Sequence, residues 1–445
     1  MRLSPKELAD HPAPFVKVGV TDLDGVLRTK YLSREKLQSA SKAGSGFCNV
    51  IFGWDVQDTV YGPPLPDPGF ADARITIDLG SGRTLPWEND TPLLLADLRG
   101  DTGPAAAACP RSLLLRILAR AEAMGLQAQF GPEYEWFAYR ETPASLERKN
   151  YRHLTPLSPG MFGYSSLRTG QHTTFWHDLA TQLTAVGVPL EGYHTETGPG
   201  ALEAALVYQP PLEAADRAIV FKETVKQVSY RHGLVASFMA KPTADLPGCG
   251  GHLHQSIWRD GVNLFHDPAR RYGMSPEGEQ YLAGQLRLLP ALMPFFAPFV
   301  NSYKRYVPGS WAAVRANWGI DNRTCALRFL PGEPASSRLE LRVPGADANP
   351  YLVMAAALAA GLYGIEHALP LELPPVQGSA YEQSVGQILP ADLGEGAGAM
   401  QIEPLLASLL GDDFVTHLLR SRQWEWQQYQ RAVTDWERRR YFELA

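Results

Sequence analysis

Cysteine is scarce in this chain of 445 residues, which contains only Cys48, Cys109, Cys249 and Cys325. The four lie far apart, and no two of them form a CxxC pair. This scarcity excludes a disulfide framework and a zinc site built from thiolates. It favours the reducing cytoplasm, which is the location we expect for the protein.

Long apolar runs and an excess of positive charge are also missing. The longest apolar stretch, Tyr351 to Ile365, is shorter than the roughly 20 residues that span a bilayer, and we interpret it as a buried helix. The first residues, MRLSPKELAD, lack the apolar core of a signal peptide. The formal net charge of −6 argues against nucleic acid and anionic membranes as partners.

The distribution of strand and helix patterns predicts two domains. Alternating residues around Asp24-Gly25 predict a β-hairpin within 15–33, and the chain up to residue 109 contains further short β-prone pieces. At Pro110 a helical periodicity begins, and short strands then alternate with helices. We therefore predict an α+β protein with a small, mostly β domain over 1–109 and a catalytic domain over 110–445.

Four segments carry side chains of the kind that bind metals or phosphates, spaced two residues apart. In a strand, residues i and i+2 point to the same face, so each pair is aimed at one place. The segments are Glu133-Tyr-Glu135, His194-Thr-Glu196 with Glu203 further on, His252-Leu-His254-Gln-Ser256, and Arg338-Leu-Glu340-Leu-Arg342.

Each segment alone is more often structural or solvent-exposed, because charged strands on a surface are common and surface ion pairs contribute little. Together, their carboxylates would repel one another at a shared site unless cations neutralised them. Oxygen-rich sites with one imidazole suit Mg²⁺ or Mn²⁺. Residues 301–328 add Arg305, Arg323 and Arg328, whose forked guanidinium groups bind phosphate or carboxylate. The pattern predicts phosphoryl transfer without a P-loop, since no GxxxxGK[ST] segment occurs and the glycines near 198 and 248 do not match a Rossmann fingerprint.

In these motifs and their order the chain resembles the glutamine synthetase family over nearly its whole length. The matching segments are DLDGVLRTK, GPEYEWF, HTETGPGALE, ASFMAKP, GGHLHQS, SYKRYVPG, NRTCALR, RLELRVPGADANPYL and VTDWERRRY. The resemblance implies an N-terminal β-grasp domain and a barrel-like catalytic domain. It also implies a homo-oligomer, expected to be a dodecamer of two stacked hexamers with active sites between neighbouring subunits.

The resemblance further implies a role for individual residues. Glu135, Glu196 and Glu203 match the ligands of one divalent cation, and Glu133, His252 and Glu340 match those of a second, Mg²⁺ or Mn²⁺ in each case. His254, Ser256, Arg328 and Arg338 match the ATP contacts. Gly248, Arg305 and Arg342 match the residues that hold the acid substrate, and Arg323 matches the residue that faces the transferred phosphoryl group. Arg305, Arg323 and Arg342 are the expected catalytic residues. The reaction implied is formation of an acyl phosphate on glutamate from ATP, followed by attack of a nitrogen nucleophile.

The departures from the family concern the nitrogen substrate. Ammonia-using members carry a Glu two residues after the glycine of the flap, whereas here Gly309 is followed by Ser310 and Trp311. The D-G-S-S segment has no clear counterpart, the glutamine of the metal loop is replaced by Ala201, and Pro247 replaces an asparagine. A tryptophan suits an organic group better than a small hydrated cation. We therefore expect a γ-glutamyl–amine ligase for an alkyl, poly- or aromatic amine, with Trp311 lining the amine site.

Three alternatives remain open at the level of the sequence. They are an ammonia-using synthetase with altered flap residues, a non-catalytic family member, and a phosphotransferase that acts on a guanidino substrate. The complete set of expected metal ligands argues against the non-catalytic alternative. The product, an amide with phosphate or a phosphagen, distinguishes the third.

Overall fold

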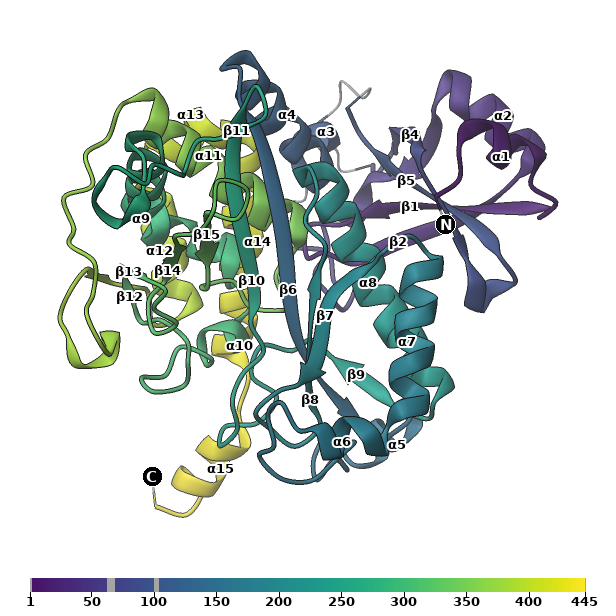
Figure 1. Ribbon diagram of the computed structural model, residues 1–445. Coiled ribbons are helices and arrows are strands. Elements are labelled where there is room, and N and C mark those ends of the chain that lie inside the picture. The colour runs from purple at the N-terminus through teal and green to yellow at the C-terminus, as the bar shows by residue number, and fades with distance from the viewer. Residues whose placement is uncertain (1, 62–68, 100–103, 445) are drawn as a thin grey trace.

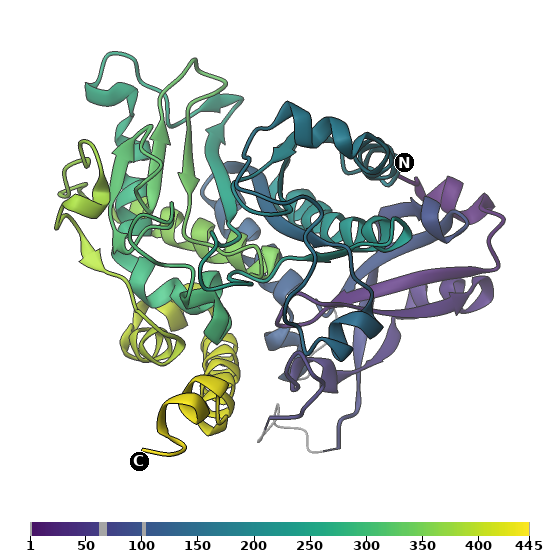
Figure 2. The same cartoon turned by 90° about the horizontal axis from the view of Figure 1, so that it is seen from below.

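The computed structural model describes residues 2–61, 69–99 and 104–444. Figure 1 shows a smaller N-terminal unit beside a larger body that is built around one long sheet. Figure 2, seen from below, shows the C-terminal helix α15 projecting away from that body. Among the described helices, none combines the length and the apolar character needed to cross a membrane. The mixed α/β character predicted from the sequence is confirmed.

The N-terminal unit is a five-stranded sheet in the order β2-β1-β5-β4-β3. Strands β1 and β5 pair in parallel, and the other neighbours are antiparallel. The strands are β1 (Phe15–Thr21), β2 (Leu27–Ser33), β3 (Ser45–Cys48), β4 (Asp72–Leu85) and β5 (Thr91–Asp97). The helices are α1 (Pro5–Asp10), α2 (Arg34–Ala43) and α3 (Pro104–Ala108), with 3-10 turns η1 (Asn49–Phe52) and η2 (Pro86–Glu88).

The hairpin predicted around Asp24-Gly25 is confirmed, because β1 and β2 pair along their full length. Gly25 has a φ of 86°, a conformation that side chains with a Cβ rarely adopt. The Asp22 carboxylate closes the turn by accepting the backbone N–H groups of Asp24 and Val26 at 3.1 and 2.9 Å. The turn chemistry that the sequence displays is therefore the chemistry that the chain uses.

The larger body contains a nine-stranded sheet with the main order β13-β14-β15-β10-β6-β8-β7, with β11 on β10 and β9 on β6. The strands are β6 (Gln127–Tyr139), β7 (Leu190–Thr195), β8 (Ala201–Leu206), β9 (Val235–Ser237), β10 (Gly251–Arg259), β11 (Val262–Asn263), β13 (Trp318–Ile320), β14 (Leu327–Leu330) and β15 (Arg338–Leu341). A separate pair is formed by β12 (Arg315–Ala316) and β16 (Gln387–Ile388).

Helices cover this sheet, and the helix predicted to be buried lies among them. The helices are α4 (Pro110–Ala123), α5 (Pro143–Arg148), α6 (Ser166–Gln171), α7 (Thr173–Ala185), α8 (Pro211–Arg231), α9 (Pro276–Phe296), α10 (Val300–Tyr303), α11 (Pro350–Glu366), α12 (Leu393–Ile402), α13 (Leu405–Leu410), α14 (Asp412–Arg431) and α15 (Asp435–Tyr441), with 3-10 turns η3 (Arg271–Gly273) and η4 (Ala380–Glu382). Helix α11 is buried along nearly its whole length, as the apolar run predicts. Its backbone approaches α9 so closely that a Cβ on Gly284 would lie 2.2 Å from the Ala360 carbonyl oxygen, which requires glycine there.

Arg111 joins the N-terminal sheet to the larger body. Its guanidinium donates to Asp97 on β5 at 2.6 Å, to Asp78 on β4 at 2.6 Å and to Asp216 on α8 at 3.0 Å. The hydroxyl of Tyr351 on α11 donates to Asp216 at 2.6 Å. Because Asp97 and Asp216 are buried, removing the arginine would leave uncompensated charges in the interior. The network fixes the two parts of the chain relative to each other.

His417 on α14 forms a second junction, with the turn η1. Its Nε2 lies 2.5 Å from the Phe52 carbonyl oxygen and 3.3 Å from the hydroxyl of Tyr61, which also donates to Phe52. Burial lowers the pKa of His417 from 6.5 to about 4. The imidazole is therefore neutral in the folded protein at pH values where an exposed histidine is charged.

This burial makes stability depend on pH. Between pH 6.5 and about 4 the unfolded chain binds a proton at His417 that the folded chain does not, so stability falls as pH falls through this window. We expect the stability of the wild type relative to His417→Gln to decrease by up to about 3 kcal/mol from pH 7 to pH 4. Thermal unfolding at several pH values measures this. The control His367→Gln, at an exposed position, should show the same pH dependence of stability as the wild type. A stability difference between the wild type and His417→Gln that did not change with pH would contradict the assignment.

Candidate active site

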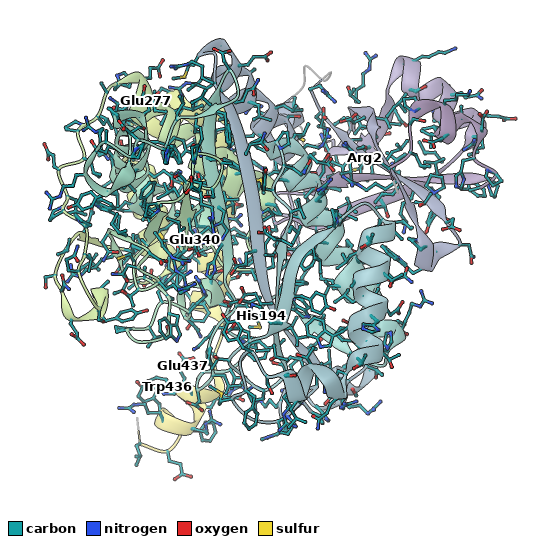
Figure 3. All side chains as sticks on the ribbon, in the orientation of Figure 1. Arg2, His194, Glu277, Glu340, Trp436 and Glu437 are labelled. Carbon is teal, nitrogen blue, oxygen red and sulfur yellow. The ribbon has the colours of Figure 1, made fainter. Side chains whose placement is uncertain are left out.

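The register of the central sheet places the predicted polar residues opposite one another. Glu133 on β6 pairs with His252 on β10, and Glu135 pairs with Glu203 on β8. His254 pairs with Glu340 and Glu340 with Arg328, while Glu203 also pairs with His194. Residues far apart in sequence therefore meet because their strands are neighbours. Figure 3 shows His194 and Glu340 in the central part of the molecule, whereas Arg2 lies in the N-terminal unit.

His252 has the surroundings of a metal ligand. Its Nδ1 lies 3.5 Å from Glu133 Oε1 and 3.7 Å from Glu340 Oε1. The residue is buried, and this nitrogen has no hydrogen-bond partner within the described part of the chain. Buried polar atoms nearly always have a partner, so an orphaned imidazole nitrogen between two carboxylates fits a cation.

A second group of possible ligands lies next to Glu133 and includes Glu203, the neighbour of Glu135 on β8. One ligand atom from each of His194, Glu196 and Glu203 can be chosen so that all three lie within 4.8 Å of one another. His194 is 3.7 Å from each of the two carboxylates. Burial, together with Glu133, Glu135 and Glu196, raises the pKa of Glu203. This crowding of carboxylates is the condition that a divalent cation relieves.

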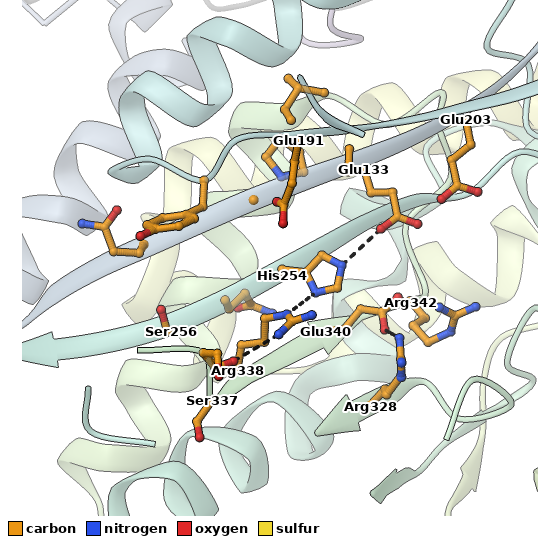
Figure 4. A pocket seen from close by; sticks show the side chains of 18 of the residues that line it. Glu133, Glu191, Glu203, His254, Ser256, Arg328, Ser337, Arg338, Glu340 and Arg342 are labelled. Atoms are coloured by element: carbon orange, nitrogen blue, oxygen red, sulfur yellow. Dashed lines mark hydrogen bonds and ion pairs between the residues drawn. The ribbon is translucent and has the colours of Figure 1, made fainter. Parts of the chain in front are cut away.

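Arginines balance the charge on the opposite side of the site. Arg328 donates to Glu340 at 2.8 Å and to Asp321 at 2.9 Å, and Arg342 also pairs with Glu340. Burial opposes ionisation of Glu340, but Arg342 and the two nearby histidines outweigh it and lower its pKa to about 2. Arg338 donates from Nε to His254 Nδ1 at 3.3 Å, and His254 Nε2 lies 3.2 Å from Glu133 (Figure 4).

Most of these side chains line one cavity of about 440 Å³. The sequence-predicted residues in its wall are Glu133, Glu203, His254, Ser256, Arg323, Arg328, Arg338, Glu340 and Arg342. A pocket that holds both carboxylates and guanidinium groups can bind a polyphosphate together with cations.

The other predicted residues lie next to this cavity or apart from it. Glu196 belongs to the group with His194, and His252 contacts Glu133 and Glu340, as described above. Glu135 shares the face of Glu133, but its Oε2 accepts the Gly250 backbone N–H at 2.5 Å, and it is not part of the compact three-residue group. Trp311 does not line the cavity and is 61% exposed.

Gly248 and Arg305 are in direct contact. A Cβ at Gly248 would lie 2.7 Å from Arg305 Cγ, so a larger residue would displace the arginine. The Arg305 guanidinium is buried and is oriented by the carbonyl oxygens of Val343 and Arg342, at 2.9 and 3.1 Å. Two backbone acceptors thus fix the direction of its remaining donors.

Two residues of the site, His194 and Tyr164, were not among the residues predicted to bind metal or substrate. His194 stands in the predicted His-Thr-Glu segment, and its spacing to Glu196 was a usable signal. Tyr164 lines the cavity with its ring centroid 4.4 Å from that of His194, and its φ is 54°. No periodic pattern marks Tyr164, because its place depends on a left-handed backbone residue in a loop.

Comparison with known proteins agrees with this geometry. Residues 107–441 match the family described as glutamine synthetase, catalytic domain. The chain is 45% identical to type-1 glutamine synthetase 2 of Dictyostelium discoideum over 97% of this chain and 84% of that protein. It is 34% identical to glutamate–isopropylamine ligase of a Pseudomonas species, over 98% and 96%.

A solved structure has the same fold. The structure titled GmaS/ADP complex, conformation 1, superposes with a TM-score of 0.86 at 30% identity and covers 99% of this chain and all of that one. With the family match over most of the length and relatives at this identity, the chain belongs to the glutamine synthetase family and is a carbon–nitrogen ligase.

Proposed function

We propose that this enzyme joins glutamate to a small organic amine at the expense of ATP and forms a γ-glutamyl amide. The observation that carries the proposal is the cavity in which carboxylates and imidazoles on β6, β8 and β10 face arginines on β14 and β15. An amine cannot displace oxide from a carboxylate, whereas it can displace phosphate from an acyl phosphate. Activation by phosphoryl transfer is therefore the chemistry that this pairing of charges supports.

We assign the residues as follows. Divalent cations, Mg²⁺ or Mn²⁺ and at least two, would be held by Glu135, Glu196 and Glu203 and by Glu133, His252 and Glu340, with His194 beside the first set. These ions would neutralise phosphate charge. His254, Ser256, Arg328 and Arg338 bind ATP, and Gly248, Arg305 and Arg342 hold the acid substrate. Arg323, on the cavity wall, neutralises charge on the phosphoryl group as it is transferred.

The reaction balances in two steps. A side-chain carboxylate oxygen of glutamate attacks the γ-phosphorus of ATP, and ADP leaves. The amine nitrogen then attacks the acyl carbon, the C–O bond to phosphate breaks, and the amine gives up a proton. The side chains that line the cavity orient the reactants and exclude water during both steps.

The metal assignment predicts a loss of bound ion in His252→Ala. Without the imidazole, the carboxylates of Glu133 and Glu340 repel each other, and we expect Mn²⁺ stoichiometry to fall by about one ion per chain together with ATP turnover. Calorimetric titration with Mn²⁺ measures this without turnover. His367→Ala, at an exposed position, is the matched control. Unchanged Mn²⁺ stoichiometry in His252→Ala would contradict the assignment.

The preference for an organic amine rests on Trp311. The residue is exposed and has a φ of 61°. By the family resemblance, it occupies the flap position at which ammonia-using members are expected to carry a glutamate. It follows a tight turn in which Ser310 donates to the Val307 carbonyl oxygen, so its loop starts close to the buried Arg305. An indole cannot accept a proton from ammonium, but it can bury the carbon skeleton of an amine.

The amine proposal predicts a selectivity. Burying about 80 Å² of apolar area contributes about 2 kcal/mol, which is more than tenfold in a rate or binding constant. We expect kcat/KM for the best organic amine to exceed that for ammonia at least tenfold, and Trp311→Glu to narrow this ratio. Phosphate release across a panel of alkyl, poly- and aromatic amines measures both. Tyr230→Glu, another exposed aromatic position, should leave the ratio unchanged.

An ammonia-using glutamine synthetase is the second candidate, because the 45% identical relative carries that name. Ammonia as the best nitrogen substrate in the same panel would establish this alternative and refute the organic amine. The relative named for isopropylamine, similar over nearly the full length, supports the first candidate.

We also propose the domain limits, assembly and location of the enzyme. A β-grasp domain over 1–109 is supported by the parallel pairing of β1 with β5, and a barrel-like catalytic domain over 110–445 by the single nine-stranded sheet and the helices around it. A dodecamer of two stacked hexamers is supported by the family and by apolar side chains exposed at the C-terminal end, Trp436, Phe442 and Leu444. A cytoplasmic location is supported by four cysteines that are all free.

A further inference from the structure

Another pocket, of about 450 Å³, lies outside the active-site cavity. It is bounded by the end of β6, the loop at 155–159, and the segment that contains α6 and the start of α7. The polar side chains that decide its character are Arg140, Arg168, Gln171 and His172. We refer to it as the Arg140–Arg168 pocket.

The two arginines in this pocket have no acidic partner in the part of the chain that the structure describes. Arg140 Nη2 donates to the Leu157 carbonyl oxygen at 3.2 Å, and Arg168 Nη1 donates to Gln171 Oε1 at 3.0 Å. Within residues 2–61, 69–99 and 104–444, neither guanidinium forms an ion pair. The acid next in sequence, Glu141, is already engaged by Lys149, Ser145 and Thr155. Most donors of both arginines therefore remain available to a ligand.

His172 supplies an additional polar atom at the same pocket. Its Nε2 is buried and has no hydrogen-bond partner among the residues that the structure describes. Burial lowers the pKa of this histidine, and the charges of the nearby Arg140 and Arg168 lower it further. In a chain with more acidic than basic residues, two unpaired arginines beside an unpartnered imidazole form a locally positive site.

The pocket is connected to the active site through a short chain of contacts. The Arg168 guanidinium lies over the Phe162 ring, 4.8 Å from its centroid. The Phe162 carbonyl oxygen accepts the Thr195 hydroxyl at 3.1 Å. Tyr164 and Ser165 donate their backbone N–H groups to Thr195, at 2.7 and 2.9 Å. Thr195 stands between His194 and Glu196 in the sequence, so the position of this segment affects the carboxylate cluster.

The opposite wall of the pocket is also attached to the active-site strands. Leu157 donates its backbone N–H to the Ala138 carbonyl oxygen at 2.8 Å, on the strand that carries Glu133 and Glu135. A Cβ at Gly200 would lie 3.0 Å from the Leu157 nitrogen, so this loop lies against the segment that leads into β8. A ligand that contacted both walls would therefore restrain β6, which carries Glu133 and Glu135, and the end of β7, which leads into Glu196.

We propose that the Arg140–Arg168 pocket binds a small dianion, a phosphate or a dicarboxylate, and that its occupancy stabilises residues 162–168 against Thr195. The forked guanidinium groups suit two-oxygen recognition of either anion. If the anion binds the ordered conformation of residues 162–168 more tightly than other conformations, it increases the population of the ordered conformation. Because this segment contacts Thr195, binding of the anion then also changes the affinity of the active site for its substrates. This site is distinct from the ligase site and does not depend on which amine is used.

Binding is tested by calorimetric titration of the full-length enzyme with inorganic phosphate and, separately, with succinate at constant ionic strength. We expect the double variant Arg140→Gln/Arg168→Gln to lose at least tenfold in affinity for one of the two anions. Arg148→Gln, an exposed arginine outside the pocket, should match the wild type. Any binding of phosphate at the active site is common to all three proteins and does not contribute to the difference.

A variant that keeps the charges separates recognition from folding. Arg140→Lys/Arg168→Lys should bind more tightly than the glutamine variant and more weakly than the wild type, because lysine lacks the fork. The anion that loses affinity identifies the ligand class as phosphate or dicarboxylate. Equal affinities in the wild type and the glutamine variant for both anions would refute the site.

Hydrogen exchange tests the coupling without any turnover. Addition of the bound anion should slow amide exchange at residues 162–168 and 193–197 in the wild type and in Arg148→Gln by at least threefold. The glutamine variant should show no such protection. Binding that leaves exchange at 193–197 unchanged would refute the connection to the active site.

Discussion

Carboxylates held opposite one another on neighbouring strands are the constraint on which the rest of this structure depends. Glu135 faces Glu203 across β6 and β8, and Glu133 and Glu340 flank His252 from two sides. Such an arrangement is unfavourable unless positive charge compensates it. Arg328 on β14 and Arg342, which directly follows β15, supply part of this charge. We propose that cations supply the remainder beside the His252 nitrogen, which has no hydrogen-bond partner among the described residues.

Holding like charges together requires a rigid support. The sheet is fixed from behind by α11 and α9, whose backbones touch at glycines, and from the side by Arg111, which ties two strands of the N-terminal sheet to α8. Preorganisation of this kind lets charged groups act without rearranging during the reaction. The charged groups that we propose for phosphoryl transfer thus belong mainly to the sheet, whereas Trp311 and Tyr164 lie in loops. If these loops contact the nitrogen substrate, as we propose for Trp311, its identity can change without disturbing the charged core.

Much of the fold could be predicted from the sequence because the relevant signals are local. The hairpin at Asp24-Gly25, the helix that starts at Pro110, the strand that carries Glu133 and Glu135, and the buried helix α11 all appear where the patterns place them. The candidate site was predictable for a related reason, since a two-residue spacing on a strand puts both side chains on one face. The family resemblance then supplied roles that the spacing alone did not.

Only the tertiary structure decided which side chains meet. The sequence determined the types of residue and the faces they share, since these follow from short-range periodicity, and its motifs and their order carried the resemblance to the family. It did not determine that His194 closes a group with Glu196 and Glu203, that Glu135 turns toward the Gly250 amide, or that Tyr164 covers His194. Those outcomes depend on strand register and on left-handed loop residues, and both are set by long-range pairing that no local pattern encodes.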